Sequence, residues 1–383
     1  MKIAIINSNY VAINKNTRKG TEIFDYVLIK NLAKQAKVRH LSITAFASGN
    51  SHLPVPIESV NYEASSTDTD IGFEHHKTYE IALISKAFSM QKEFDLYHVN
   101  LGNGDLVLPF APFVGKPILV TMHGSFLEEK YNKKYLSLFK NIPNIYFISI
   151  SNVQRQPLPK LNYAATIYHG VDSKKTWKFS PTSSDYIMWA GRAIREKGIN
   201  TVVETIKKSG KKAKLFPMVK DDSPSWIKRI EQKPNNSGNI SYNFNFSRNK
   251  LASQYQQAKA FLFPIEWEEP FGMVMIESMA CGTPVIGYAM GSVPEVIIDG
   301  VTGFIVNPSD EDKRGNFIIK KTGVDGLNEA IQRIYALSEK DYTQMRKACR
   351  ELVERKFTVK SMTNQYIEIY KKVIEDSKTS RKK

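Results

Sequence analysis

The feature that most constrains the fold is the alternation, from the first residue, of short apolar runs with longer segments whose apolar residues recur at helical spacing. This alternation is typical of β-α-β units, in which helices join parallel strands. Residues 2–6 form the first predicted strand, and the segment beginning at Gly20 places Ile23, Phe24 and Val27 on one helical face. We therefore predict an α/β protein built on parallel sheets.

The alternation runs through two series, separated by a polar stretch at 172–185. Further strands of the first series are predicted at 38–44, 96–99, 118–121 and 146–150. Strands of the second series are predicted at 186–190, 213–219, 260–264 and 285–288. A chain of 383 residues is long enough for two cores. We place one domain at 1–175, a second at 176–358, and a closing helix with a basic tail at 359–383.

Composition excludes several classes of protein. Hydrophobic residues make up 42% of the chain and charged residues 24%, which excludes a disordered chain. Cys281 and Cys349 provide neither a disulfide framework nor a zinc-binding pair, which fits a reducing compartment. No apolar run reaches the roughly 18 residues of a membrane span, and residues 1–7 have strand character. We expect a cytoplasmic protein that does not span a membrane.

The net charge of +16 favours a polyanionic partner, such as nucleic acid, an anionic membrane surface or the phosphates of a nucleotide. General solubility with a basic tail is the alternative interpretation. The chain lacks the interleaved aromatic and basic residues of RNA-binding modules, so we expect no nucleic-acid partner. Peripheral contact with the inner face of an anionic membrane stays open, because no strongly amphipathic anchor stands out.

The most informative segment is 268–284, in which a Pro-Phe-Gly turn leads into an apolar helix. Gly282 stands where a left-handed helix cap is usual. The N–H groups around Gly272 and Met273 lack partners within the helix, and with the helix dipole they favour a bound anion such as phosphate.

Glu269 lies just before this helix and Glu277 lies inside it. Ionised carboxylates can accept hydrogen bonds from the vicinal hydroxyls of a ribose or a sugar. The spacing alone is also compatible with two surface acids that flank a core helix. Glu196 and Glu204 have the same spacing without this context.

A second candidate is the segment 190–198, which follows a predicted strand at the edge where open α/β sheets bind ligands. Arg192 and Lys197 could clamp a diphosphate there and stabilise it as a leaving group. Arg195 is expected to point to solvent. The alternative is a solvated basic loop.

The first series offers weaker candidates. Gly20 and Thr21 could bring backbone N–H groups near a phosphate, but no G-x-G-x-x-G is present, which weakens a dinucleotide-dependent oxidoreductase. His123 ends a predicted strand, where it could hydrogen-bond a substrate hydroxyl or transfer a proton. It could equally be a loop residue or a hydrogen-bonded core group.

Two further patterns are interpreted as structural. Asp68 and Asp70 match a D-x-D pattern that could hold a divalent cation, but no strand ends on them, so we favour a loop. Ser292 and Glu295 have the spacing of a helix capping box, which predicts a structural role for Glu295.

In this order the motifs resemble those of the family-4 retaining glycosyltransferases, also described as glycosyl transferases group 1, of the GT-B fold. The resemblance covers residues 1–374. It rests on Lys19-Gly20-Thr21-Glu22, Thr121-Met122-His123-Gly124, His169-Gly170-Val171-Asp172, Gly191-Arg192 with Lys197-Gly198, Glu269 with Glu277, and Gly291-Ser292-Val293-Pro294-Glu295 with Gly300 and Thr302-Gly303-Phe304. It implies two Rossmann-like, doubly wound domains that face across a cleft, with the C-terminal helix returning to the first domain.

The resemblance also implies roles for individual residues, with the donor held by the second domain and the acceptor by the first. Catalytic roles fall on Glu269, His123, Arg192 and Lys197. Donor-binding roles fall on Gly20, Arg192, Lys197, Gly272, Met273 and Glu277. The cations would hold the donor diphosphate, Glu277 the ribose hydroxyls, and Glu269 would face the donor sugar.

The implied reaction is the retaining, metal-independent transfer of a hexosyl group from a nucleotide sugar to a saccharide, lipid-linked or small-molecule acceptor. No other cofactor is implied. Residues 216–222 contain no glycine where the family usually has a glycine-containing turn, so the base stays open, with a UDP- or GDP-sugar expected. Three other functions stay open: a nucleotide-sugar epimerase, a phosphorylase on the same scaffold, and a non-enzymatic basic module that binds polyanions.

Overall fold

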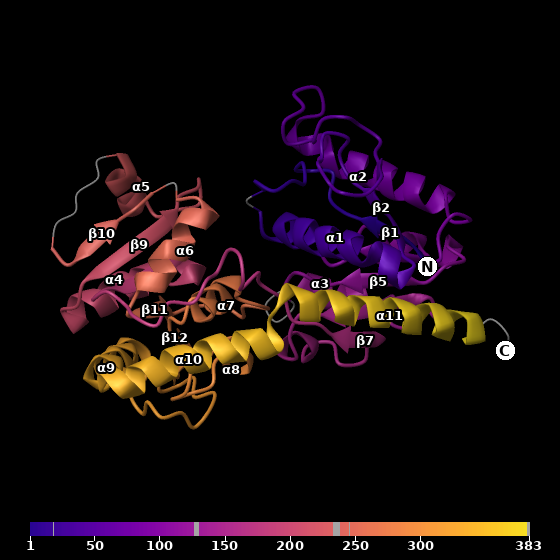
Figure 1. The fold of residues 1–383 in the computed structure, drawn as a ribbon. Helices are drawn as coiled ribbons and strands as arrows, with labels where there is room; N and C mark the ends of the chain where they lie inside the picture. Colours follow the sequence, from indigo (N-terminus) through magenta and orange to yellow (C-terminus); the bar gives the residue numbers. More distant parts are fainter. Residues whose placement is uncertain (18, 126–129, 233–237, 245, 381–383) are drawn as a thin grey trace. The chain divides into compact units, whose positions relative to one another are not determined.

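A computed structural model describes residues 1–17, 19–125, 130–232, 238–244 and 246–380. The chain forms two compact units (Figure 1). One comprises Met1–His169 with Val359–Lys383, and the other comprises Gly170–Thr358. The chain thus passes from the N-terminal to the C-terminal unit after His169. From the polar stretch in the sequence we had placed this boundary after residue 175.

Within the described residues, the N-terminal unit has a parallel sheet with the strand order β3-β2-β1-β4-β5-β6-β7. Its strands are β1 (Lys2–Ile6), β2 (Ser42–Phe46), β3 (Ile57–Glu58), β4 (Leu96–Val99), β5 (Ile118–Thr121), β6 (Ile145–Ser149) and β7 (Tyr163–Thr166). Its helices are α1 (Gly20–Arg39), α2 (Gly72–Ser89), α3 (Lys130–Ser137) and α11 (Val359–Ser380), with 3-10 turns η1 (Leu108–Phe113) and η2 (Val153–Arg155). The strand order reverses between β1 and β4.

Helices cover both faces of this sheet, which explains the uninterrupted apolar run of β1. Ile3 and Ile5 belong to one hydrophobic cluster with residues of α1 and α11. Ala4 and Ile6 belong to a second cluster with residues of α2 and η1. A parallel strand buried on both faces needs apolar residues at every position, because successive side chains point to opposite faces.

The C-terminal helix α11 lies along the N-terminal unit (Figure 1), as the resemblance implied. Tyr366 and Tyr370 are fully buried on it. The hydroxyl of Tyr366 lies 3.1 Å from that of Thr121, and the hydroxyl of Tyr370 lies 2.7 Å from His98 Nδ1. Burial lowers the pKa of His98 to about 3, so this ring is neutral at neutral pH.

Within the described residues, the C-terminal unit has a parallel sheet with the order β10-β9-β8-β11-β12-β13. Its strands are β8 (Ile187–Arg192), β9 (Ala213–Met218), β10 (Ile240–Tyr242), β11 (Ala260–Phe263), β12 (Val285–Tyr288) and β13 (Gly303–Val306). Its helices are α4 (Ile199–Ser209), α5 (Ser225–Gln232), α6 (Arg248–Gln257), α7 (Met273–Ala280), α8 (Val293–Val296), α9 (Gly323–Ala336) and α10 (Glu339–Lys356), with the 3-10 turn η3 (Arg195–Lys197). Two parallel-sheet units confirm the predicted α/β class.

Two arginines of α10 fix the carboxyl end of α7. Arg346, which is fully buried, donates to the carbonyl of Cys281 at 3.3 Å, and Arg350 donates to that of Ala280 at 2.9 Å. Cations at this end also complement the helix dipole. Gly282 follows with a φ of +88°, which confirms the predicted left-handed cap.

The start of one predicted strand is wrong. The sequence placed a strand at 38–44, but α1 continues to Arg39 and β2 begins only at Ser42. His40 ends the helix in the left-handed region, with a φ of 51°, and the Leu41 N–H donates to the carbonyl of Ala36. Val38 is 80% exposed on the last turn of α1, so its apolar side chain does not mark a sheet position.

None of the helices in the described part of the chain has both the length and the apolar character needed to cross a lipid bilayer.

Candidate functional site

The candidate site begins where β8 and β11 end, at the carboxyl edge of the C-terminal sheet. The strand order reverses between these two strands, and open α/β sheets bind ligands at such a point. The loops after the two strands are tied together, since the Glu266 N–H donates to the carbonyl of Glu196 at 2.9 Å. This edge therefore collects residues from two separate stretches of sequence.

The turn after β8 requires a glycine. Gly198 has a φ of +71°, and a Cβ atom there would lie 1.9 Å from the carbonyl oxygen of Pro264 in the loop after β11. Only glycine combines this conformation with so close a backbone approach. The turn holds Lys197 directly over the segment that precedes α7.

Lys197, Glu269 and Trp267 form one compact group. The Lys197 ammonium makes an ion pair with Glu269 Oε2, and the Trp267 indole N–H donates to the same oxygen at 3.0 Å. The ammonium also lies 4.7 Å from the centre of the Trp267 ring, within cation–π range. Glu269 is 8% exposed, so the carboxylate is held in place by one cation and one indole.

The backbone of Glu269 is clamped by the loop after β12. Gly291 has a φ of +51°, and a Cβ atom there would lie 2.3 Å from the Glu269 carbonyl oxygen. The Ser292 N–H donates to that oxygen at 2.9 Å. The capping box predicted for Ser292 and Glu295 is wrong: within the described residues the Ser292 side chain accepts no capping hydrogen bond, and its N–H donates to the Glu269 carbonyl.

Glu277 is paired with an arginine that the sequence analysis did not single out. Glu277 is 5% exposed, and its Oε1 accepts from Arg248 Nε at 3.0 Å and Nη2 at 2.5 Å. Burial raises the pKa of Glu277, and the charge of Arg248 opposes this rise. Arg248 is the first residue of α6. A cation at a helix N-terminus interacts unfavourably with the helix dipole, and the Glu277 carboxylate offsets this interaction.

The other predicted donor-site residues lie at the same edge. Arg192 is the last residue of β8, is exposed, and makes no ion pair among the described residues. Gly272 precedes the first residue of α7, Met273, so the first N–H groups of that helix lack intrahelical partners. The Arg195 side chain is 84% exposed, which confirms the expectation that it points to solvent.

The predicted residues of the N-terminal unit lie within that unit in different settings. Gly20 is the exposed first residue of α1, where an added Cβ atom would meet nothing within 4 Å. The His123 ring stacks on His169 at 5.8 Å and contacts Phe24 at 4.9 Å. Burial lowers the pKa of His123 well below 6.5, so at neutral pH it can hydrogen-bond but does not carry a positive charge.

The acidic pair Asp68 and Asp70 lies in a loop, as predicted. The Asn61 amide donates to Asp68 Oδ2 at 2.9 Å, and the Asp70 N–H donates to Asp68 Oδ1 at 3.0 Å. These hydrogen bonds lower the pKa of Asp68. Within the described ranges, no three His, Cys, Asp or Glu residues gather into a group that could hold a metal ion.

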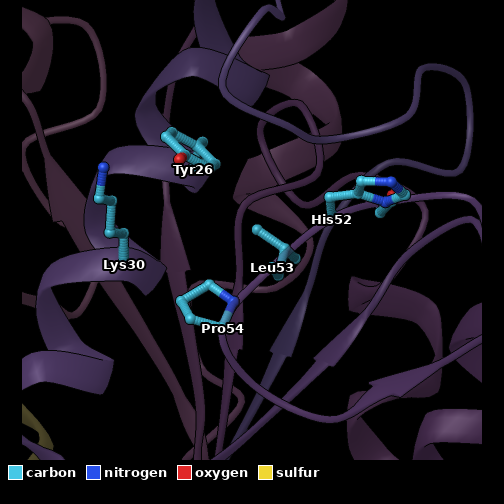
Figure 2. Close-up of a pocket in the computed structure, with 6 residues that line it drawn as sticks. Tyr26, Lys30, His52, Leu53 and Pro54 are labelled. Atoms are coloured by element: carbon cyan, nitrogen blue, oxygen red, sulfur yellow. The ribbon is translucent and has the colours of Figure 1, made fainter.

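A pocket of about 500 Å³ lies beside α1, but it contains none of the predicted site residues (Figure 2). Tyr26 and Lys30 of α1 line one side, and His52, Leu53 and Pro54 line the other.

Comparison with known proteins gives a family match for the C-terminal unit. Residues 173–352 match the family described as "Glycosyl transferases group 1". The C-terminal unit of the chain is thus similar to the group 1 glycosyltransferases. The matched residues span β8 to β13 and most of α10, and so include the whole site at the carboxyl edge of the C-terminal sheet.

Curated relatives of the chain include a Klebsiella pneumoniae protein described as an uncharacterized 41.2 kDa protein in the cps region. It is 30% identical over 48% of this chain and 46% of its own. An uncharacterized glycosyltransferase of Methanocaldococcus jannaschii is 28% identical over 51% of this chain and 56% of its own. The chain thus aligns with about half the length of each. The N-acetyl-alpha-D-glucosaminyl L-malate synthase of Bacillus anthracis is 23% identical over 100% of both chains.

Solved structures similar to the chain show the same fold. Sucrose-phosphate synthase from Thermosynechococcus elongatus superposes with a TM-score of 0.72 at 21% identity, over 98% of this chain and 99% of that one. HepE from Anabaena, in complex with UDP and glucose, superposes with a TM-score of 0.70 at 15% identity, over 96% of this chain and 98% of that one. The architecture is the GT-B fold of glycosyltransferases.

Proposed function

We propose that this glycosyltransferase moves a hexosyl group from a nucleotide sugar to a saccharide, lipid-linked or small-molecule acceptor, with retention of anomeric configuration and without a metal ion. One observation carries the proposal. Glu269 and Glu277 flank the start of α7, and each carboxylate is fixed by its own cation, Lys197 or Arg248. An ordered arrangement of charges at a ligand-binding sheet edge suits a phosphate-bearing, hydroxyl-rich donor.

The donor diphosphate would be held by Arg192, Lys197 and the first N–H groups of α7, at Gly272 and Met273. Arg192 is exposed and makes no ion pair within the described residues, so its guanidinium is available to an anion. Helix N-termini bind phosphate through free N–H groups and the helix dipole. These groups would replace the metal ion that often neutralises a diphosphate leaving group.

Glu277 would accept hydrogen bonds from the ribose hydroxyls. Its pairing with Arg248 supports this role, because a buried carboxylate that is oriented by a cation is pre-positioned for paired donors. The base would lie farther along this edge. HepE, of the same fold, binds UDP, which supports a nucleoside diphosphate donor while leaving UDP and GDP as alternatives for this chain.

In the reaction, the bond between the anomeric carbon and the diphosphate oxygen breaks, and a bond to the acceptor oxygen forms on the same face. The proton of the acceptor hydroxyl passes to the departing diphosphate oxygen. Negative charge grows on the leaving diphosphate, where Lys197 and Arg192 stabilise it more in the transition state than in the bound donor. Glu269 would face the anomeric carbon and stabilise its positive charge. A front-face route and a two-step route through a glycosyl ester of Glu269 both give retention.

Location belongs to the same proposal: a cytoplasmic enzyme in peripheral contact with an anionic membrane, to which the net charge of +16 would be attracted. Sedimentation with vesicles of phosphatidylcholine and phosphatidylglycerol at moderate salt tests this contact. We expect pelleting that weakens as salt increases. A protein that stays in the supernatant at all salt concentrations would refute the contact.

The function is tested by incubating the chain with UDP-glucose, UDP-N-acetylglucosamine or GDP-mannose and a panel of sugar acceptors. We expect nucleoside diphosphate release that depends on the acceptor, persists in EDTA, and yields a product with the donor's anomeric configuration by NMR. Lys197→Ala is expected to lower kcat by a factor of about 100, the cost of losing one charge at the leaving group. Complete loss of turnover in EDTA, or an inverted product, would contradict the proposal.

A further inference from the structure

A long loop without regular structure, residues 307–322, joins β13 to α9. Loops longer than roughly 12 to 15 residues are uncommon, and they are usually either functional or disordered. Hydrogen bonds fix this one in place. Asn307 Oδ1 accepts from the Arg314 N–H at 2.8 Å, and Asp299 Oδ2 accepts from the Ile318 N–H at 2.7 Å. A function is therefore the expected reason for its length.

Arg314 connects this loop to the segment that precedes α7. Its Nη1 donates to Glu268 Oε1 at 2.5 Å, although the two residues are 46 positions apart in the sequence. Its Nε and Nη2 lie 2.9 Å from the two oxygens of Asp312, a two-point contact that orients the planar guanidinium. The Arg314 side chain is 29% exposed and that of Glu268 is 15% exposed, so the ion pair is partly shielded from solvent.

Glu268 in turn contacts the loop after β12. Its second oxygen, Oε2, accepts from the Gly291 N–H at 2.7 Å. The next N–H along the chain, that of Ser292, donates to the Glu269 carbonyl at 2.9 Å. Two successive N–H groups thus hold two successive residues, Glu268 by its side chain and Glu269 by its backbone.

This arrangement depends on the ion pair of Glu268. Gly291 approaches Glu269 so closely that an added Cβ atom would lie 2.5 Å from the Glu269 nitrogen. Glu268 and Glu269 are neighbouring acids, and each has its own cation. These cations are Arg314 and Lys197. Without Arg314 the Glu268 carboxylate is free to turn toward water, which would leave the buried Gly291 N–H without its acceptor.

We propose that Arg314 is a positioning residue for the glycosyl transfer. Through Glu268 and the loop after β12 it holds the backbone of Glu269, and so sets where the Glu269 carboxylate meets the donor sugar. This role rests on the proposed function, in which Glu269 faces the anomeric carbon. Misplacing a catalytic group by about 1 Å can cost a factor of about 100 in rate, so a remote ion pair can act on the reaction.

The test compares Arg314→Ala with Lys313→Ala in the full chain. Lys313 is the preceding residue of the same loop, and its ion pair with Asp310 is exposed. With UDP-glucose, UDP-N-acetylglucosamine or GDP-mannose, whichever is consumed, Arg314→Ala should lower kcat about tenfold. Its affinity for UDP or GDP, which lack the sugar that Glu269 would face, should stay within about twofold by calorimetry. Lys313→Ala should change neither quantity.

Two further variants show whether Arg314 acts through Glu268. Arg314→Lys keeps a cation for Glu268 but loses the two-point contact with Asp312, so it should recover part of the lost kcat. Glu268→Gln keeps an oxygen for the Gly291 N–H but removes the charge that Arg314 pairs with. Adding Arg314→Ala to Glu268→Gln should therefore cost no further activity. A further loss of about tenfold would show that Arg314 acts by another route, and would overturn the proposal.

Hydrogen exchange at the Gly291 and Ser292 N–H groups, followed by NMR, measures the same contact without any reaction. We expect exchange about tenfold faster in Arg314→Ala than in the unaltered chain, and an unchanged rate in Lys313→Ala. Unchanged exchange in Arg314→Ala overturns the proposal. A loss of UDP or GDP affinity as large as the loss of kcat also overturns it, because the effect would then be a general loosening of the site.

Two outcomes separate this proposal from the proposed function. If sugar transfer occurs and Arg314→Ala leaves kcat unchanged, Arg314 is not a positioning residue, while the transferase function stands. If the unaltered chain transfers no sugar, the proposed function falls and the catalytic role of Arg314 falls with it. Faster exchange in Arg314→Ala would then show that the contact through Glu268 serves only the fold.

Discussion

At the scale of single residues, the ion pair of Arg248 and Glu277 is expected to stabilise the fold as well as to orient a carboxylate of the proposed donor site. Arg248→Ala would leave the buried Glu277 carboxylate without its cation. We expect the free energy of unfolding to fall by about 2 kcal/mol, because the unpaired charge keeps its desolvation cost. Urea denaturation at neutral pH measures the change.

Two controls identify the cause of that loss. In the double variant Arg248→Ala, Glu277→Gln the buried charge is also removed, so part of the stability should return. Arg195→Ala breaks an exposed pair with Glu266 and should cost less than about 1 kcal/mol. A double variant that is less stable than Arg248→Ala would show that the charge of Glu277 is not the cause.

Two glycines with nearly equal backbone angles separate steric contact from backbone strain. Gly198 and Gly210 have φ values of +71° and +67°, but an added Cβ atom meets the Pro264 carbonyl only at Gly198. Gly210→Ala is expected to cost about 1 kcal/mol, from the left-handed conformation alone. Gly198→Ala should cost about 3 kcal/mol or more. Thermal denaturation compares them, and equal losses would refute the close approach.

The sequence singled out Lys197, Glu269 and Glu277 because each belongs to a recognisable motif. It did not point to Arg248 or Trp267, which lie outside those motifs. Arg248 reaches Glu277 only because α6 packs on α7. Contacts of this kind depend on how helices pack together, and the spacing of residues in the sequence does not predict that packing.

At the scale of elements, the strands that sequence reasoning missed share one property. β3, β7, β10 and β13 were not predicted, and each is an edge strand of its sheet. They have two to four residues, and all but β13 are only partly buried. Central strands are buried on both faces and carry continuous apolar runs, whereas edge strands need less apolar surface and so give a weaker signal.

The helix α11 is predicted to be essential to the N-terminal unit. Deleting 359–383 removes Tyr366, Tyr370 and the other α11 residues of the cluster on β1, and it exposes His98. We expect the unit to lose its cooperative unfolding transition, since several buried aromatic and aliphatic side chains are lost together. Deleting only 376–383 keeps every residue of the cluster and should leave the transition unchanged. Hydrogen exchange of β1 and β5 measures both effects, and protection that survives the longer deletion would contradict the prediction.

At the scale of the whole molecule, both units have the same central order of strands, with one reversal each. The cationic site that we propose for the donor lies at the reversal between β8 and β11. The N-terminal sheet has its reversal between β1 and β4. Each reversal is a position at which an open α/β sheet can bind a ligand.

The units should also differ in their response to acid, because all seven histidines lie in the N-terminal unit. Burial lowers the pKa of His169 from 6.5 to about 4, that of His98 to about 3, and that of His123 well below 6.5. A histidine whose folded pKa is depressed stabilises the fold above its unfolded pKa, and this contribution is lost as the pH falls from 6.5 toward 4.

We therefore expect the N-terminal unit to lose about 1 kcal/mol per buried histidine for each pH unit below about 6. Hydrogen exchange at neutral and mildly acidic pH measures the two units separately in the full chain. His169→Phe, which keeps an aromatic ring beside Phe24, should reduce the slope. Equal acid sensitivity of the two units, or a slope unchanged by His169→Phe, would contradict this account.

The central claim is that the C-terminal site binds a nucleoside diphosphate through Glu277 and the cations at the same sheet edge. Calorimetric titration of the full chain with UDP and with GDP, in EDTA, tests it most directly. We predict that one of them binds, that Glu277→Gln weakens this binding by about tenfold or more, and that the exposed Glu204→Gln leaves it unchanged. Equal affinity in the unaltered chain and in Glu277→Gln would contradict the account.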